Sequence, residues 1–309
     1  MRQTKPKKSL CIRLFSSKLM FPLLLCIWLL YFAYARSQST HSLRGGHPDF
    51  NPSEVYKTQL APVKIVNLVI VAGHAVLRLN KLSAADTNDA AWYLLAYQKN
   101  QGFPAIISSH IKKGIDLAAA DRSSLLVFSG GQTRKDVGPT SEAASYYYLA
   151  DEKKWSLAVM DRVYLEEYAR DSFENLLFSV CRFREVQGYY PRSITVVGFD
   201  FKGRRYADLH RSAIGFPVSN FTYVGLPSPE QFNQERAVRG EEDATRSFEA
   251  DRFGCSDPAL NEKRQKRNPF YRTVPYTLAC PELSELLTWC GPGEFNVESL
   301  PWGTKRQLN

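Results

Sequence analysis

Short runs of mostly apolar, often β-branched residues alternate along this chain with longer segments of helical periodicity. The runs cover residues 65–71, 125–129, 193–198 and 221–225, with a shorter one at 157–160. Apolar runs of this length, bounded by glycine or polar residues, are typical of strands buried on both faces of a parallel sheet. The pattern therefore predicts five strands in one sheet.

Between the runs, apolar residues recur every three or four positions, which is the spacing of an amphipathic helix. We expect helices over residues 86–99, 104–120, 171–186 and 204–214, and another that begins near Thr140. Strands that alternate with helices imply right-handed crossovers and helices on both faces of the sheet. The predicted fold class is α/β, a Rossmann-like three-layer sandwich with a mainly parallel sheet.

This alternation sets the expected domain boundaries. Residues 63–226 carry all five runs and form the predicted Rossmann-like domain. Beyond them the pattern weakens into a charged helical stretch at 230–253 and a strongly polar stretch at 261–268. We therefore treat residues 227–309 as a C-terminal extension, which either covers a site or packs behind the sheet.

The N-terminal part of the chain has a different character. Residues 19–35 contain no charge and are bounded by Lys18 and Arg36. A helix of this length reaches roughly 26 Å, which suits a thin bilayer. Residues 1–18 are basic, and residues 36–62 are rich in Ser, His, Gly and Pro, as linkers are. We expect a cytosolic tail, a signal anchor forming one transmembrane helix, and a linker, in that order.

Topology and compartment follow from this arrangement. Basic residues before the apolar segment predict a single-pass type II membrane protein of the secretory pathway, in the endoplasmic reticulum or Golgi, with a lumenal body. The membrane is then a partner through residues 19–35. Ala33-Tyr34-Ala35 also resembles the cleavage site of a signal peptide. The basic, acid-free start leaves a mitochondrial location as the other alternative.

Two further features bear on a lumenal location. Cys255, Cys280 and Cys290 lie in the last fifth of the chain, and an oxidising lumen would allow two of them to pair. Cys280 with Cys290 would close a short loop, but the sequence leaves the connectivity open. Asn220 begins a glycosylation sequon, which is usable in the lumen unless the adjoining strand buries it.

Composition and charge exclude some classes of protein. The chain has 309 residues, 44% of them hydrophobic, so it can form a sizeable core. Its formal net charge is +9, but residues 1–18 hold six basic residues and no acid, which leaves 34 basic against 31 acidic residues elsewhere. A nearly balanced body gives no reason to expect nucleic-acid binding.

Polar residues follow the expected strands at their carboxyl ends. Gly73 and His74 follow the first strand, residues 129–134 follow the second, and Glu142 lies in the first turn of the next helix. Open α/β sheets bind ligands at this edge, and helix N-termini with bare N–H groups attract anions. A small anionic ligand is therefore expected there.

The candidate residues fall into two groups. The catalytic candidates are His74, Glu142 and Glu174. The ligand-binding candidates are Gly73, Ser129, Gly130, Gly131, Gln132, Thr133, Arg134, Ser141, Asn175, Lys202 and Arg204. No metal-ligand spacing is present, so no metal is expected, and no cofactor is identified. Each candidate also has a structural explanation, such as a turn cap for His74, a helix-dipole partner for Glu142 and a solvated helix face for Arg204.

Several phrases of this chain resemble a known family. VIVAGHAV, LLVFSGGQTR, GPTSEAASYY, EEYARDSFENLLFS and ITVVGFDFKGRRYADLHRSAIGFP are similar to the domain of unknown function 218 family (YdcF/SanA/ElyC-like), most closely to its eukaryotic, mostly fungal branch. The resemblance covers about residues 65–225 and implies a Rossmann-like domain, which in several bacterial relatives follows one N-terminal anchor. It marks as pocket-lining Gly73, Ser129, Gly130, Gly131, Ser141, Glu142, Ala143, Glu174 and Asn175.

One departure from the family bears on chemistry. Bacterial members have a His followed by an Arg after the fourth strand, where this chain reads Phe201-Lys202-Gly203-Arg204-Arg205. If that His is chemical, this chain lacks it unless His74 or His210 substitutes. The family has no settled reaction, although cell-envelope roles and an S-adenosylmethionine-type ligand are associated with members.

Three functions remain open at this stage. The first is binding or transfer of an anionic small molecule, such as a nucleotide, sugar phosphate or lipid-linked precursor, with Arg134 on the anion. The second is hydrolysis, with Glu142 or Glu174 as general base and His74 polarising the substrate. The third is a non-catalytic membrane scaffold. A dinucleotide dehydrogenase is not expected, because no G-x-G-x-x-G follows the first strand.

Overall fold

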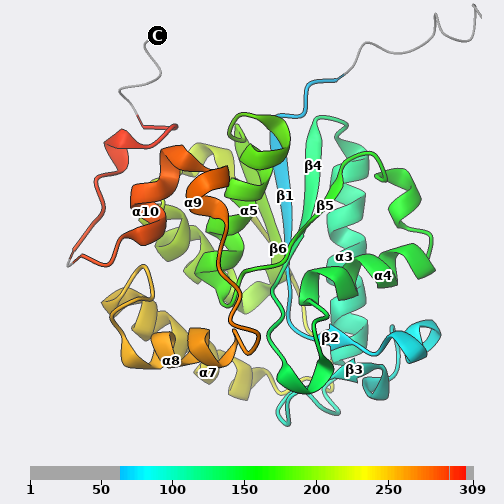
Figure 1. The fold of residues 1–309 in the computed structure, drawn as a ribbon. Helices are drawn as coiled ribbons and strands as arrows, with labels where there is room; N and C mark the ends of the chain where they lie inside the picture. The colour runs from blue at the N-terminus through cyan, green and yellow to red at the C-terminus, as the bar shows by residue number, and fades with distance from the viewer. Residues whose placement is uncertain (1–62, 292, 304–309) are drawn as a thin grey trace, which may run out of the picture. The chain divides into compact units, whose positions relative to one another are not determined.

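Five strands form one sheet in which every neighbouring pair runs parallel (Figure 1). The computed structural model describes residues 63–291 and 293–303. The expectations for residues 1–18, 19–35 and 36–62 lie outside these residues. Across the sheet, the order is β5-β4-β1-β6-β7. The strands are β1 (Asn67–Ala72), β4 (Ser124–Ser129), β5 (Val163–Glu166), β6 (Ser193–Phe199) and β7 (Phe221–Leu226).

The order of the strands fixes where a ligand site can form. The chain builds outward from β1 through β4 to β5, and then crosses back to add β6 and β7 on the other side of β1. This is the arrangement of a Rossmann-like α/β fold. The direction of winding reverses between β1 and β6. Loops leaving these two strands diverge to opposite faces, so a crevice opens at their carboxyl ends.

Helices cover both faces of the sheet (Figure 1). The helices α3 (Phe103–Ala120) and α4 (Glu142–Glu152) pack against the face to which Val69 and Val71 point. The opposite face, with Leu68 and Ile70, is covered by α5 (Ser172–Gln187). Alternate residues of β1 therefore enter two separate hydrophobic cores, as the continuous apolar run predicts. The expected α/β class with a mainly parallel sheet is confirmed.

Two local predictions are wrong. Residues 157–160 do not form a strand, because Leu157 and Met160 are 62% and 61% exposed and a 3-10 turn, Ser156–Ala158, begins there. The strand that pairs with β4 is β5, a few residues later. The expected helix at 86–99 is also absent. That stretch contains the 3-10 turn Asp89–Ala91 and the strand β3 (Trp92–Tyr93), which pairs antiparallel with β2 (Val76–Leu77).

The C-terminal extension belongs to the same packed unit as the sheet. It contains α7 (Gln234–Ala250), α8 (Pro258–Lys266), α9 (Tyr276–Ala279) and α10 (Ser284–Thr288). Its buried side chains enter the core that α5 forms with the sheet. These are Phe248, Phe253, Leu260, Tyr276, Cys280, Leu283, Leu286, Phe295 and Leu300. The extension therefore packs on the α5 face, and α7 and α8 also reach the carboxyl ends of the strands (Figure 1).

A disulfide ties this extension together. It joins Cys255, between α7 and α8, to Cys290, after α10, with Cα atoms 5.7 Å apart. The pairing of Cys280 with Cys290 considered from the sequence is therefore wrong. Cys280 is a free, fully buried thiol whose Sγ lies 3.3 Å from the hydroxyl of Tyr190.

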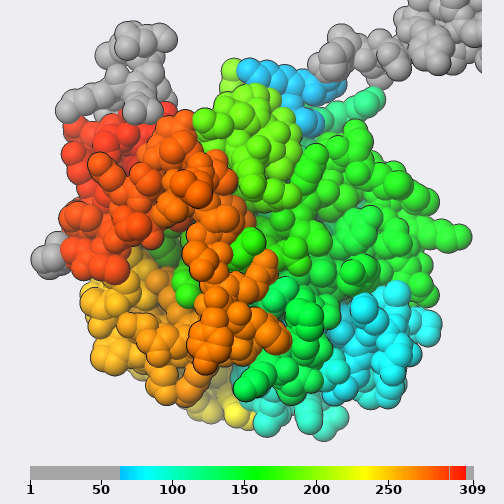
Figure 2. Space-filling view, in the orientation of Figure 1, coloured from blue at the N-terminus to red at the C-terminus, as the bar shows by residue number. Residues whose placement is uncertain are grey.

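The segment between α8 and α9 crosses the front of the domain. Figure 2 shows it in orange, lying over the green residues that follow β5. Arg272 donates to the carbonyl of Glu167 (2.7 Å), and Arg267 donates to that of Arg170 (2.8 Å). These bonds hold the extension at the edge of the sheet where the crevice opens. No helix in the described part of the chain has the length and apolar character needed to cross a bilayer.

Candidate functional site

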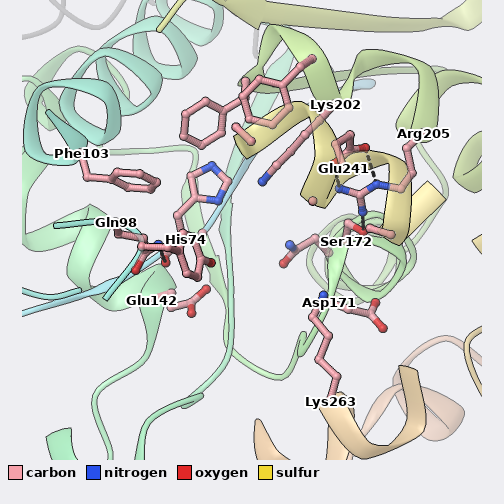
Figure 3. Close-up of a pocket in the computed structure, with 18 of the residues that line it drawn as sticks. His74, Gln98, Phe103, Glu142, Asp171, Ser172, Lys202, Arg205, Glu241 and Lys263 are labelled. Atoms are coloured by element: carbon pink, nitrogen blue, oxygen red, sulfur yellow. Dashed lines mark hydrogen bonds and ion pairs between the residues drawn. The ribbon is translucent and has the colours of Figure 1, made fainter. Parts of the chain in front are cut away.

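A cavity of about 360 Å³ lies at the carboxyl ends of β1 and β6. Its lining comes from both parts of the chain. Gly73 and His74 follow β1, Phe199 ends β6, and α7 and α8 close the opposite side with Glu241 and Lys263 (Figure 3). The volume falls in the range typical of small-molecule sites, and the position is the one where α/β sheets bind ligands.

Glycines after β1 and β4 bring Glu142 into this cavity. A Cβ atom on Gly73 or Gly130 would lie within 2.9 Å of the Cβ and carboxylate of Glu142, a separation that side chains do not tolerate. The Glu142 carboxylate accepts a hydrogen bond from the Thr133 hydroxyl (2.6 Å). The Gly-Gly bend therefore admits this carboxylate to the cavity wall.

The N-terminus of α4 does not offer bare N–H groups. The backbone N–H of Glu142 donates to the carbonyl of Gly131 (3.1 Å), and that of Ala143 donates to the carbonyl of Gly130 (3.1 Å). The Ser141 hydroxyl caps the N–H of Ala144 and itself donates to Glu167. These groups already have partners, so they cannot hold an anion as the sequence suggested.

Ser129 connects the strand end to a buried acid beneath the cavity. Its hydroxyl is 2.7 Å from the carboxylate of Glu166 and 2.9 Å from the amide oxygen of Asn175. Burial raises the pKa of Glu166 to about 7, against hydrogen bonds from Ser129, the Tyr168 backbone and Tyr276. Asn175 lines the cavity, whereas Ser129 and Glu166 support it from below.

The start of α5 carries a dense ion-pair cluster. Asp171 caps the N–H of Glu174 (2.9 Å) and pairs with Arg264 of α8 (2.7 Å). Glu174 pairs with Arg170 (2.5 Å) and does not line the cavity. Burial opposes the charged form of Asp171, but the positive charge of Arg264 holds the pKa of Asp171 well below its usual value. The pKa of Glu174 is raised, because Glu174 is buried and lies beside the negative charge of Asp171. Glu174 is thus engaged by cations of the protein itself.

A π-helix after β6 positions the next cation. Arg205–His210 forms six residues of π-helix, a form that is rare and frequent at functional sites. The Arg205 guanidinium makes a two-pronged ion pair with Glu241 of α7 (2.6 and 2.7 Å) and donates to the hydroxyl of Ser172. That hydroxyl lies 2.9 Å from Nε2 of His210. Arg205 therefore joins the C-terminal extension to the sheet edge.

Other cations line the cavity without such partners. Among the described residues, no carboxylate lies within 4 Å of a charged nitrogen of Lys202, Arg236, Lys263 or Arg267. Burial, with the charge of Arg205, lowers the pKa of Lys202 to about 7. Burial, with the charge of Arg267, lowers that of Lys263 to about 8. The cavity therefore concentrates cations that form no close ion pair with a carboxylate of the described residues.

His74 stands on the other side of the cavity, and its pKa is lowered by burial and by the charge of Lys202. Its Nε2 atom is buried and makes no hydrogen bond with the protein. The Gln98 side chain donates to the backbone carbonyl of His74 (3.1 Å) and accepts from the Leu95 N–H (2.7 Å), which fixes this loop. A neutral imidazole with one free nitrogen can donate to a ligand or accept from it.

The structure brings together only part of the predicted set. Gly73, His74, Glu142, Asn175 and Lys202 line the cavity. Behind them lie Ser129, Gly130, Gly131, Thr133, Ser141 and Glu174. The remaining candidates, Gln132, Arg134 and Arg204, do not line it; Arg204 is 71% exposed and pairs with Glu249.

Sequence analysis missed every cation supplied by the extension. The sequence pattern indicates only a strongly polar stretch at 261–268, whereas the structure places Lys263 in α8 and Arg267 directly after its end, both lining the cavity. The signal was present, because Asp257 and Pro258 form a helix start before them. Arg205, which directly follows the candidate Arg204, is not among the predicted site residues.

The comparisons with known proteins leave the activity open. No family model matches the chain. It is similar to the uncharacterised protein YOR238W of Saccharomyces cerevisiae, with 27% identity over 300 residues, which cover 78% of this chain and 99% of the yeast protein. The resemblance to the domain of unknown function 218 family therefore stays a prediction, and function has to be argued from the cavity.

Proposed function

We propose that this protein binds, or transfers a group from, a small anionic molecule in the cavity at the carboxyl ends of β1 and β6. The observation that carries the proposal is the set of cations facing one space, Lys202, Lys263 and Arg267, none of which has a carboxylate of the described residues within 4 Å. Gathering such charges opposes folding unless an anion compensates them, so an anionic ligand accounts for their presence. A phosphate or diphosphate group has the charge to do this.

The test uses the smallest such ligand. Inorganic pyrophosphate is titrated calorimetrically into the full chain in detergent micelles. We expect saturable binding that Lys263→Ala or Arg267→Ala weakens by about tenfold or more, the usual worth of one charge-assisted contact. Arg134→Ala and Arg204→Ala remove the same charge outside the cavity and are the matched controls, with changes within about twofold.

The outcomes separate the alternatives. Loss of pyrophosphate binding in Arg134→Ala alone would return the anion site to the Gly-Gly-Arg loop predicted from the sequence. If the unmodified chain did not bind pyrophosphate, the proposal would be contradicted and the membrane scaffold would be favoured. Equal weakening in all four variants would indicate only non-specific attraction to net positive charge.

Hydrolysis is the second candidate, and the position of Glu142 favours it. This carboxylate lies in the cavity wall within reach of a bound ligand, whereas Glu174 is held by Arg170. A general base needs such a position. Glu142→Gln would then abolish turnover of a bound substrate while its affinity is kept. If Glu142→Gln lost affinity for the ligand, and neither this variant nor the unmodified chain turned it over, binding would remain the function.

We further propose that residues 19–35 anchor the chain in a membrane of the secretory pathway, with the cavity on the lumenal side. The disulfide between Cys255 and Cys290 supports this, because such bonds persist in oxidising compartments and are rare in the cytosol.

A further inference from the structure

One wall of the cavity is aromatic rather than charged. The rings of Phe199 and Phe232 stack with centroids 5.6 Å apart, and Phe201 stacks on Phe232 at 6.1 Å. Phe103, at the start of α3, extends this wall beside Phe199, with centroids 5.7 Å apart. All four rings line the cavity. Phe199 ends β6, Phe201 follows it and Phe232 precedes α7, so the sheet and the extension build this wall together.

His74 continues the aromatic wall with a polar atom. Its imidazole lies 4.9 Å from the ring of Phe199 and 5.5 Å from the imidazole of His110. Nε2 of His74 is buried without a protein partner. Buried polar atoms are nearly always hydrogen-bonded in folded proteins, so this nitrogen points to a ligand with a polar group beside an apolar surface.

The charged and aromatic walls lie on different sides of the same space. Figure 3 shows Phe103 and His74 on one side, Arg205 and Lys263 on the other, and Lys202 extending between them. An inorganic phosphate or a sugar phosphate would occupy the charged side and leave the aromatic wall and His74 without partners. A prenyl or acyl phosphate would cover the wall but would offer no hydrogen bond to His74.

We infer that the ligand is a phosphate ester of a planar heterocycle, that is, a molecule of the nucleotide type. Its ring would lie on the wall formed by Phe103, Phe199, Phe201 and Phe232 and bond Nε2 of His74. Its phosphates would lie on Lys202, Lys263 and Arg267. The inference rests on the proposed anion binding and adds the chemical class of the rest of the ligand.

The experiment compares fragments of such a molecule on the full chain. Dissociation constants are measured by calorimetry for pyrophosphate, ribose 5-phosphate, adenosine diphosphate, uridine diphosphate and farnesyl diphosphate. We expect at least one nucleoside diphosphate to bind about fivefold or more tightly than pyrophosphate, because stacking of a base on an aromatic side chain is worth at least that much. Ribose 5-phosphate should bind no better than pyrophosphate.

Variants then locate the ring. Phe232→Leu keeps an apolar side chain but removes the stacking surface, so the advantage of the nucleoside diphosphate should fall while pyrophosphate affinity is unchanged. Tyr148→Leu is the matched control, because Tyr148 is 41% exposed and lies outside the cavity. If Phe232→Leu still bound the nucleoside diphosphate as much more tightly than pyrophosphate as the unmodified chain does, the ring would bind elsewhere and the inference would be overturned.

The remaining outcomes distinguish the inference from the proposal on which it rests. Equal affinity for pyrophosphate and both nucleoside diphosphates would overturn the heterocycle and leave anion binding intact. An advantage for farnesyl diphosphate alone would overturn it in favour of a lipid phosphate. If no ligand bound, pyrophosphate included, the proposed anion site would itself be contradicted.

Discussion

At the scale of single residues, the close approach of Glu142 to two strand-end glycines is the most demanding contact of the site. A Cβ atom on Gly73 would lie 2.7 Å from both the Cβ and Oε2 atoms of Glu142, so one of the two side chains must move. Gly73→Ala should lower the free energy of unfolding by about 1–3 kcal/mol, as overpacking of a well-packed site does. Urea unfolding measures this.

Gly240 provides the matched control for that prediction. It lies inside α7, and a Cβ atom there would meet nothing within 4 Å. Gly240→Ala should therefore raise the free energy of unfolding by about 0.5–1 kcal/mol, through the usual preference of helices for alanine. If Gly73→Ala were as harmless as Gly240→Ala, Glu142 would not occupy the place that the structure gives it.

Lys202 should make stability depend on pH. Its pKa is about 7 in the folded protein and 10.5 ordinarily, so between these values the unfolded chain binds the extra proton. Stability from this residue therefore falls as the pH drops from about 10.5 to 7, and the penalty is complete below 7. Lys202→Met should stabilise the unliganded protein most at pH 6.5 and little at pH 10.

Comparing Lys202→Met with the unmodified chain in urea at the two pH values measures the contribution of Lys202, which includes its charge coupling to Lys263 and His74. A gain in stability that is independent of pH would mean that Lys202 keeps its ordinary pKa.

An anion bound beside Lys202 should raise the lowered pKa of Lys202, because it stabilises the charged ammonium. Calorimetry at pH 8 in buffers of different ionisation enthalpy should then detect proton uptake with pyrophosphate.

At the scale of elements, the Cys255–Cys290 disulfide holds the connection between α7 and α8. The bond spans 35 residues, and removing a cross-link of this kind costs about 2–4 kcal/mol of stability. Because Lys263 lies in α8 and Arg267 caps its C-terminus, we expect reduction to weaken pyrophosphate binding as well. Thermal melts and calorimetry with and without dithiothreitol measure both effects.

The double variant Cys255→Ser, Cys290→Ser supplies the control for reduction. It should melt where the reduced protein melts, and dithiothreitol should not shift it further. A shift of the double variant by reductant would place the sensitive thiol elsewhere. Cys181 and Cys280 are the other cysteines in the described part of the chain, and both are buried.

The elements show what the sequence could and could not predict. The strands near residues 65–71, 125–129 and 193–198 were found because each is buried on both faces, so its apolar run is continuous. The strand β5 lies at the edge of the sheet and reads Val-Tyr-Leu-Glu with partial burial. The sequence pattern instead favours the more apolar residues 157–160, of which Leu157 and Met160 are exposed.

The site was predictable only where local sequence determines it. Gly73, Glu142 and Asn175 lie at strand or helix ends, so their meeting at one sheet edge follows from the α/β alternation. Lys263 and Arg267 reach the cavity because tertiary packing folds the extension back onto that edge, which no periodicity records. Lys263 and Arg267 therefore come from the part of the chain where the pattern is weakest, whereas Lys202 follows a strand and was predicted.

At the scale of the whole molecule, the exposed sequon tests on which side of a membrane the body lies. Asn220 and Thr222 are exposed at the start of the edge strand β7, so packing within the described residues does not block the sequon. If the full chain is a type II protein with a lumenal body, Asn220 should carry a glycan. Expression in eukaryotic cells should give a band that an endoglycosidase shifts and that Asn220→Gln abolishes.

A second sequon makes the result decisive in either direction. Tyr271 is 91% exposed, has a positive φ that asparagine tolerates, and is followed by Arg272 and Thr273, so Tyr271→Asn creates an accessible acceptor. A lumenal body should gain a second shift in this variant. A shift from Tyr271→Asn but none from Asn220 would keep the lumenal topology and show that Asn220 is passed over. No shift from either site, with both so exposed, would contradict the lumenal body and favour the mitochondrial alternative.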